Sequence, residues 1–134
     1  MICSRTPFRI SIGGGGTDHP FYFKLKGSKF ISATINQYIY VFITKRLLDK
    51  KILTQTSKIQ FTTDLEKISH IYIREVLRYF KIKDSIQIGT FSTLPSASGI
   101  GLGTSSSLLV GLVNCLSVYK KLKFSKMEIA KIAH

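Results

Sequence analysis

The sequence predicts an α+β fold built on a mostly antiparallel sheet. Segments with strand patterning outnumber those with helical patterning, and most of them come earlier in the chain. The length of 134 residues suits one domain, which can bury roughly two-thirds of its unfolded surface. The hydrophobic fraction of 44% is close to the globular average, so the composition indicates neither a disordered chain nor a fibrous repeat.

The first strand patterns surround a run of glycines. Residues 8–12 alternate in polarity and lead into glycines at 13–16, which predicts a strand followed by a sharp loop. Residues 30–35 and 38–43 are rich in Ile, Val, Tyr and Phe. Because Asn36 and Gln37 separate them, we expect these two segments to form a hairpin.

Three further segments have weaker strand signals or a clear alternation. Residues 52–56 and 59–63 are short and rich in Ile and Thr, which predicts two minor strands. Residues 85–91 alternate regularly and predict a stronger strand before the loop that begins near residue 92.

Helices are predicted in three places. Thr63 and Glu66 form a capping-box pattern, and apolar residues recur at helical spacing as far as Phe80. Residues 105–119 are apolar on nearly all sides, which is typical of a buried helix. Ser125 opens a further helix through a second capping box, and the sequence stops inside that helix without a C-cap glycine. We therefore expect a domain truncated at its C-terminal end.

The charge balance is strongly basic, with a net charge of +13. The lysines and arginines are scattered along the chain rather than gathered in one block. We rank solvated surface charge first, an anionic small-molecule partner second and nucleic acid third.

Neither cysteine chemistry nor a membrane segment is indicated. Cys3 and Cys115 lack the close spacing of a metal site, which favours two inert, reduced side chains. The longest apolar runs are far shorter than the ~20 residues that a bilayer requires. Because Arg5 and Arg9 interrupt the N-terminal region where a secretory signal would be apolar, we expect a cytoplasmic protein with no membrane partner.

A glycine-rich segment, residues 94–107, has the features of a phosphate-binding loop. Glycines at 99, 101 and 103 allow positive φ angles and a close approach of the backbone to a ligand. The segment runs directly into a predicted helix, so backbone N–H groups and the positive end of the helix dipole converge on one point. It matches neither a Walker A loop nor a dinucleotide fingerprint. A flexible loop with a Ser/Thr helix cap is the structural alternative.

The N-terminal motif, residues 5–20, carries side chains suited to a sugar and a phosphate. A predicted strand delivers Arg9, four glycines follow, and then Thr17 and Asp18. A carboxylate accepts hydrogen bonds from neighbouring sugar hydroxyls, and a guanidinium stabilises phosphoryl oxygens. A turn with an Asx cap is the alternative interpretation.

The two motifs together resemble the GHMP kinases, the superfamily of galactokinase, homoserine kinase, mevalonate kinase and phosphomevalonate kinase. The sequence Gly-Leu-Gly-Thr-Ser-Ser-Ser at 101–107 resembles their nucleotide-binding motif, with Thr104 replacing the common first serine and Pro95 lying further from Gly101 than usual. The N-terminal string resembles the heptose 7-phosphate kinase branch, Arg-x-Pro-x-Arg-Ile-Ser-x-x-Gly-Gly-Gly-Thr-Asp-x-Pro. It is also similar to the galactokinase signature, although Gly15-Gly16 stands where that signature has Glu-His.

The resemblance implies roles for particular residues. It implies Arg9 as the catalytic residue at the transferring phosphate, and Arg5, Thr17 and Asp18 as substrate-binding residues, with a surface salt bridge as the alternative for Arg5. It implies ATP and Mg²⁺ as cofactors, with Thr104 and Ser105 as metal-binding residues. The implied ATP-binding residues are Pro95, Ser98, Gly99, Gly101, Leu102, Gly103, Thr104, Ser105 and Ser106.

The resemblance also implies a fold and a reaction. The fold is that of ribosomal protein S5 domain 2, with helices on one face of the sheet. Residues 1–134 would form the ATP- and sugar-binding N-terminal domain, without the C-terminal GHMP domain. The reaction is ATP-dependent phosphorylation of a manno-heptose 7-phosphate at its anomeric hydroxyl, for capsule or surface polysaccharide. The metal-binding Glu and catalytic Asp of the family would lie beyond residue 134, so the fragment alone is expected to be inactive.

Three alternatives stay open. One is another GHMP sugar kinase, such as a galactokinase-like or fucokinase-like enzyme. A second is a non-catalytic remnant of a kinase. A third is a nucleic-acid-binding module with an S5-like fold, which predicts basic residues and exposed aromatics on one sheet face. Tyr38 and Tyr40 are candidates for such aromatics, although we expect them first in the core of the hairpin.

Overall fold

The structure is a computed structural model that describes residues 1–17, 20–94 and 102–134. One mixed sheet has the strand order β1-β2-β5-β3-β4. Every pairing is antiparallel except that of β3 with β5. The strands are β1 (Ile2–Gly13), β2 (Ile31–Lys45), β3 (Ile52–Gln55), β4 (Ile59–Thr62) and β5 (Ile86–Ser92).

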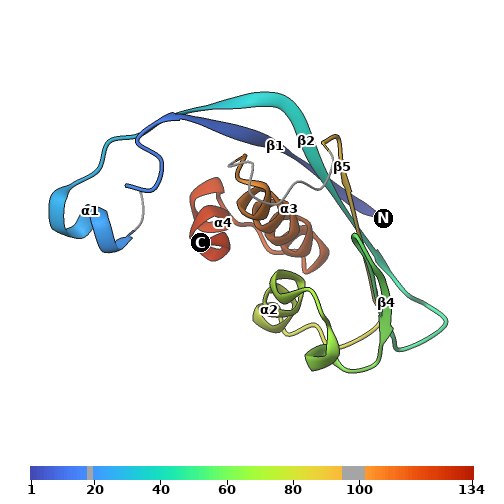
Figure 1. The fold of residues 1–134 in the computed structure, drawn as a ribbon. Coiled ribbons are helices and arrows are strands. Elements are labelled where there is room, and N and C mark those ends of the chain that lie inside the picture. The colour runs from blue at the N-terminus through green and yellow to red at the C-terminus, as the bar shows by residue number, and fades with distance from the viewer. Residues whose placement is uncertain (18–19, 95–101) are drawn as a thin grey trace.

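Three helices lie on one face of this sheet, and a fourth lies apart from it (Figure 1). These three helices are α2 (Ile71–Tyr79), α3 (Thr104–Tyr119) and α4 (Lys126–Ala133), of which α4 packs against α3, and the outlying helix is α1 (Pro20–Lys26). The arrangement confirms the predicted α+β fold, its mostly antiparallel sheet and its helices on one face. None of the helices in the described part of the chain combines the length and apolar character needed to cross a bilayer.

The predicted hairpin at 30–43 is wrong, because β2 runs through it as one strand of 15 residues. Its register with β1 shifts between the pairs Pro7–Tyr38 and Arg9–Thr34, so β2 has extra residues at this point. Asn36 and Gln37 lie in that irregularity. Neither residue has a positive φ angle, which the tightest hairpin turns require. The polar pair therefore bends a strand instead of ending it.

The predicted capping box at Thr63 and Glu66 is also wrong. Asp64 caps a short 3₁₀ helix, η1 (Leu65–Lys67), by accepting a hydrogen bond from the Glu66 backbone. The Glu66 side chain instead pairs with Arg78 at 2.5 Å. The Gln60 side chain accepts a hydrogen bond from the Ser69 N–H and donates one to the Lys67 carbonyl. A continuous helix would need these two backbone groups for its own hydrogen bonds. The helix consequently begins at Ile71.

The other predicted elements are confirmed within one or two residues at most boundaries. The weak strands are β3 and β4, the alternating segment is β5, and the buried helix is α3. Ser125 and Glu128 form the predicted capping box at the start of α4.

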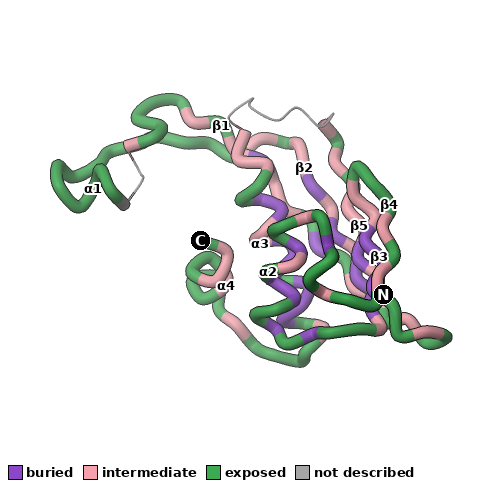
Figure 2. The backbone as a smooth tube through the Cα atoms, turned by 60° about the horizontal axis from the view of Figure 1, so that its bottom comes forward, coloured by how far each residue is buried: buried purple, intermediate pink, exposed green. Residues whose placement is uncertain are grey.

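The core lies between the sheet and the helices (Figure 2). Its fully enclosed side chains come from every layer and include Phe8, Val41, Ile88, Leu77 and Leu112. Helix α3 packs closely against β1 at Gly111. The Ser4 hydroxyl donates to the Gly111 carbonyl at 2.9 Å, and a Cβ on Gly111 would lie 2.8 Å from Thr6 Oγ1. A glycine is required at this crossing because no side chain fits between the two elements.

One part of the chain projects from this core. The distal half of β1, helix α1 and the first half of β2 form an arm that extends past the sheet (Figures 1 and 2). We call residues 10–17 and 20–34 the arm. Its apolar side chains are exposed, including Ile12, Phe21, Leu25, Phe30 and Ile31.

Candidate functional site

The N-terminus of α3 has the geometry of an anion site. Gly103 is the N-cap residue, with φ of 66° and ψ of 30°, and as a glycine it supplies no side chain to cap the helix. The first helical hydrogen bond joins the Ser107 N–H to the Gly103 carbonyl at 2.9 Å. The N–H groups of Thr104, Ser105 and Ser106 therefore have no acceptor within the helix. With the helix dipole they favour a bound anion such as a phosphate.

Two contacts hold this helix end on β1. The Ser107 hydroxyl donates to the Pro7 carbonyl at 3.1 Å. The Arg9 N–H donates to the Leu102 carbonyl at 3.3 Å. Strand β1 therefore fixes both the residue before Gly103 and the end of the first turn of α3.

These contacts bring the two sequence motifs together at Arg9. A Cβ placed on Gly103 would lie 3.3 Å from Arg9 Cγ and 3.4 Å from Arg9 Nε. The Arg9 side chain thus lies against the glycine that opens α3, which brings its positive charge close to the start of the helix. A cation close to the start of a helix strengthens the attraction for a phosphate group.

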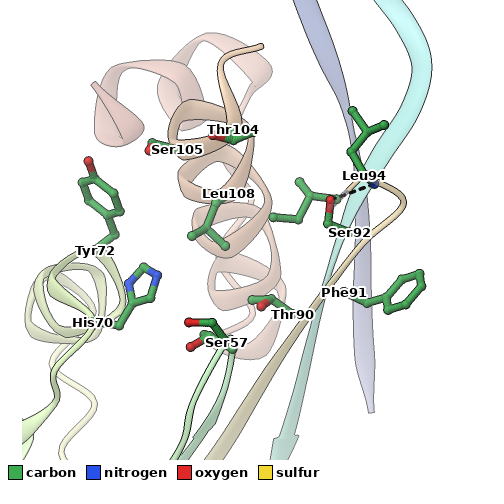
Figure 3. Close-up of a pocket in the computed structure, with 12 residues that line it drawn as sticks. Ser57, His70, Tyr72, Thr90, Phe91, Ser92, Leu94, Thr104, Ser105 and Leu108 are labelled. Atoms are coloured by element: carbon green, nitrogen blue, oxygen red, sulfur yellow. Dashed lines mark hydrogen bonds between the residues drawn. The ribbon is translucent and has the colours of Figure 1, made fainter. Parts of the chain in front are cut away.

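A pocket of about 350 Å³ adjoins the same helix end. Its volume lies within the range of small-molecule sites. In Figure 3 the α3 residues Thr104, Ser105 and Leu108 form one wall, and His70 and Tyr72 of the α2 region form the opposite one. The remaining lining residues come from β2, the β3–β4 turn, β5 and the segment that follows β5, and are Ile39, Thr56, Ser57, Thr90, Phe91, Ser92 and Leu94.

The pocket combines aromatic and apolar surface with several hydroxyls. His70 and Tyr72 have ring centroids 5.8 Å apart. Burial lowers the pKa of His70 below its usual value, so the ring is uncharged at neutral pH. A neutral, partly apolar pocket beside a phosphate site is suited to the uncharged part of a phosphorylated ligand.

The Arg5 side chain points to the face of the sheet that the helices leave uncovered. Ser4 and Thr6 contact α3, and side chains alternate along a strand, so the intervening Arg5 points to the uncovered face. Its guanidinium lies over the Tyr38 ring at 4.7 Å. This cation–π contact gives Arg5 a structural function, and its assignment to substrate binding stays a prediction.

Thr17 is held within the arm. Its hydroxyl donates to the Gly14 carbonyl at 2.7 Å and lies 3.0 Å from the Ser28 hydroxyl. Its N–H also bonds to the Gly14 carbonyl, which closes a turn. The other predicted site residues, Asp18, Pro95, Ser98, Gly99 and Gly101, lie outside the described residues.

The acidic side chains of the described residues are engaged elsewhere. Asp49 forms a double hydrogen bond with Arg46, and these bonds lower the pKa of Asp49 to about 2. Glu66 and Glu75 pair with Arg78. Within the described ranges no three His, Cys, Asp or Glu side chains gather as a metal site. Magnesium usually takes few protein ligands when it is bound through phosphates, so the hydroxyls of Thr104 and Ser105 suit a phosphate-bound ion.

Sequence reasoning missed the α2 side of the pocket. His70, Tyr72, Ser57 and Thr90 come from separate segments with no shared motif, and only the fold brings them together.

Comparison with known proteins identifies relatives along the whole chain. The family model described as the GHMP kinases N terminal domain matches residues 67–134. The D-glycero-alpha-D-manno-heptose 7-phosphate kinase of Campylobacter jejuni is 34% identical over 99% of this chain and 42% of its own length. The mevalonate kinase of Saccharolobus solfataricus is 34% identical over 71% of this chain and 30% of its own length.

A solved structure of a heptose phosphate kinase is also similar to this chain. The D-glycero-D-manno-heptose 1-phosphate kinase of Bacteroides thetaiotaomicron aligns with a TM-score of 0.83 and 26% identity, over 99% of this chain and 46% of that one. The chain thus spans less than half the length of each of these relatives.

Proposed function

The chain belongs to the GHMP kinase family, and we propose that it supplies the ATP-binding part of a sugar kinase acting on a manno-heptose phosphate. The observation that carries this proposal is the contact of Arg9 with Gly103, which joins the N-terminal motif to the phosphate-binding helix end beside a pocket. Two of the similar proteins are named as kinases of a heptose phosphate, which supports a heptose phosphate as the substrate.

ATP would bind with its phosphates at the N-terminus of α3. The N–H groups of Thr104, Ser105 and Ser106 would donate to phosphate oxygens. The nucleoside would occupy the adjoining pocket, where Tyr72 and Leu108 offer apolar surface. Thr104 and Ser105 line the pocket as well as the helix end, so one extended ligand would contact both places.

Arg9 and Mg²⁺ would share the charge of the phosphates. Mg²⁺, when bound, neutralises phosphate charge in the transfer step, and the hydroxyls of Thr104 and Ser105 are its candidate protein ligands. Arg9 would stabilise charge on the transferring phosphoryl group, because its guanidinium lies beside the helix end. Asp18, aided by Thr17 and Arg5, would bind the sugar.

The finer assignments follow from the family resemblance. The acceptor would be the anomeric hydroxyl of a heptose 7-phosphate, and the product would feed surface polysaccharide synthesis. We place the protein in the cytoplasm, where ATP is available. The 134 residues would be one N-terminal domain of a larger enzyme, and we expect no turnover from them alone, because phosphoryl transfer needs a group to activate the hydroxyl.

Calorimetric titration tests this proposal. The 134-residue chain should bind Mg·ATP, and heptose 7-phosphate should bind more tightly than galactose. A coupled assay for ATP consumption should detect no turnover by the chain with heptose 7-phosphate. If ATP does not bind to the folded chain, the proposal is wrong.

A second candidate function has one observation in its favour. On the uncovered sheet face the Tyr38 ring lies 6.3 Å from Tyr40, which lies 6.2 Å from Phe91, and Arg5 stacks on Tyr38. Aromatic rings beside an arginine can stack on nucleic-acid bases. RNA binding that weakens steeply with salt would support this alternative, and its absence at low salt would exclude it.

A further inference from the structure

His70 occupies a position in the pocket that neither the sequence motifs nor the family explains. It is the N-cap residue of α2, yet its side chain makes no capping hydrogen bond. It instead forms part of the pocket wall opposite α3, beside Tyr72 (Figure 3). A capping position is usually filled by a short polar side chain, so a ring at this site is unexplained by helix capping alone.

The two ring nitrogens of His70 have different surroundings. Nδ1 is buried and has no hydrogen-bond partner among the residues that the structure describes. Nε2 is therefore the nitrogen through which this side chain can meet a molecule in the pocket. Burial lowers the pKa of the ring, so it is uncharged at neutral pH and can form a hydrogen bond with an uncharged group.

The position of the ring relative to the phosphate site indicates which part of a ligand it would meet. Thr104 and Ser105 line the pocket at the α3 end, where the phosphates would bind. His70 lines the opposite wall, with Ser57 and Thr90 as further polar neighbours in the pocket. A group that contacts His70 is thus separated from the helix N-terminus by the width of the pocket.

We propose that His70 positions the nucleoside of the bound nucleotide through a hydrogen bond from its Nε2. This inference rests on the proposed function, because it requires the nucleotide to lie in this pocket. It assigns His70 no contact with the phosphates and no part in phosphoryl transfer. A substitution of His70 should therefore change the affinity for ligands that contain a nucleoside and leave the affinity for a bare phosphate chain unchanged.

Two substitutions of His70, each tested with ATP and with tripolyphosphate, distinguish a hydrogen bond to the nucleoside from a purely structural role of the ring. His70→Phe keeps a planar ring and removes the hydrogen bond, and His70→Gln keeps a polar atom near the position of Nε2. His70→Phe should weaken ATP binding about five-fold, the value expected for one hydrogen bond. His70→Gln should recover most of that loss. Binding of inorganic tripolyphosphate, which has no nucleoside, should be the same in all three proteins.

Nitrogen NMR of the imidazole rings gives a readout that packing alone would not produce. The His70 signals can be assigned because they disappear in His70→Phe, and His134 serves as an exposed control ring. Addition of ATP should shift the Nε2 resonance of His70, and tripolyphosphate should not. Equal weakening of ATP and tripolyphosphate, or an unshifted Nε2 when ATP is bound, would overturn the inference. Absence of binding by both ligands to the wild type would instead overturn the proposed function.

Discussion

Two of the positive-φ glycines in the described part of the chain, Gly103 and Gly14, lie in very different surroundings. Gly103 and Gly14 both have positive φ angles, of 66° and 76°. Gly103 lies against Arg9 at the start of a helix that is bonded to β1. Gly14 packs against Lys29 and Phe30 within the arm, whose apolar side chains are exposed.

The comparison shows what a glycine turn needs, beyond its backbone conformation, to form a candidate anion-binding site. A positive φ only permits close approach of the backbone. At Gly103 the neighbouring strand supplies a cation and holds the helix end in place. In the described part of the arm, the turn at Gly14 is held by its own residues, with Thr17 bonding to the Gly14 carbonyl. The first turn is therefore preorganised by the core, and the second is not.

The largest expected effect is on nucleotide binding and comes from Gly103→Val. A valine there would strain a left-handed backbone and push against the Arg9 side chain. ATP affinity should fall by about 30-fold or more, or ~2 kcal/mol. The control is Gly16→Val, since Gly16 also has a positive φ, of 89°, but has open space around its Cβ position. Equal ATP affinities of the two variants in calorimetry would contradict the comparison.

The next effect is on stability and comes from Gly111→Ala. The added methyl group would lie 2.8 Å from Thr6 Oγ1 and 3.0 Å from Ser4 Oγ, so α3 must move from β1. Overpacking of this kind costs about 1–3 kcal/mol, which should lower the main thermal transition.

Gly14→Ala, in the arm, is the control for Gly111→Ala, because it also adds one methyl group at a crowded glycine. Its methyl group would meet the Lys29 carbonyl at 2.2 Å, a closer clash than at Gly111. We nevertheless expect the main transition to be unchanged and hydrogen exchange to rise in the arm alone. A fall in melting temperature as large as that of Gly111→Ala would show that the arm belongs to the cooperative core.

A smaller effect distinguishes the two arginines of the N-terminal motif. Arg9→Ala should weaken tripolyphosphate binding about five- to ten-fold, because a charge-assisted hydrogen bond is lost. Arg5→Ala should leave tripolyphosphate binding unchanged, because the proposed function of Arg5 concerns the sugar and not the phosphates, and it should cost about 0.5–1 kcal/mol of stability through the lost contact with Tyr38. The reverse pattern in calorimetry and thermal unfolding would place the anion site on the uncovered sheet face.

The smallest effect concerns the cap of α4. Ser125→Ala should cost about 1 kcal/mol, seen as faster hydrogen exchange in α4. Hydrogen bonds from Ser125 lower the pKa of Glu128 below its usual value. The ionised Glu128 carboxylate therefore stabilises the fold above the usual pKa of a glutamate, and this stabilisation is lost as the pH falls through the lowered pKa of Glu128. A Ser125→Ala protein whose stability keeps the wild-type pH dependence in that range would contradict this assignment.

Local patterns in the sequence were enough to predict most of the elements. The capping box at Ser125 and the buried helix α3 follow from spacing and composition, and both are confirmed. The errors arose where tertiary contacts decide. Pairing along β1 keeps β2 continuous through Asn36, and the bonds made by Gln60 delay the start of α2.

The candidate site was predictable only where residues close in the chain form a motif. Gly103 and the residues after it are such a motif, and so is the segment that contains Arg9. The contact between the two motifs depends on the way α3 crosses β1 at Gly111. His70 depends on the position of α2 relative to α3, for which the sequence contains no local signal.

One measurement tests most directly the central claim that the N-terminus of α3 is the phosphate site. Amide NMR spectra of the ¹⁵N-labelled 134-residue chain would be recorded during titration with Mg·ATP. The account predicts that the amides of Gly103, Thr104, Ser105 and Ser106 shift most, while the described amides of the arm, such as those of Gly14 and Gly27, stay in place. Saturable shifts confined to the arm, with the first turn of α3 unchanged, would contradict it.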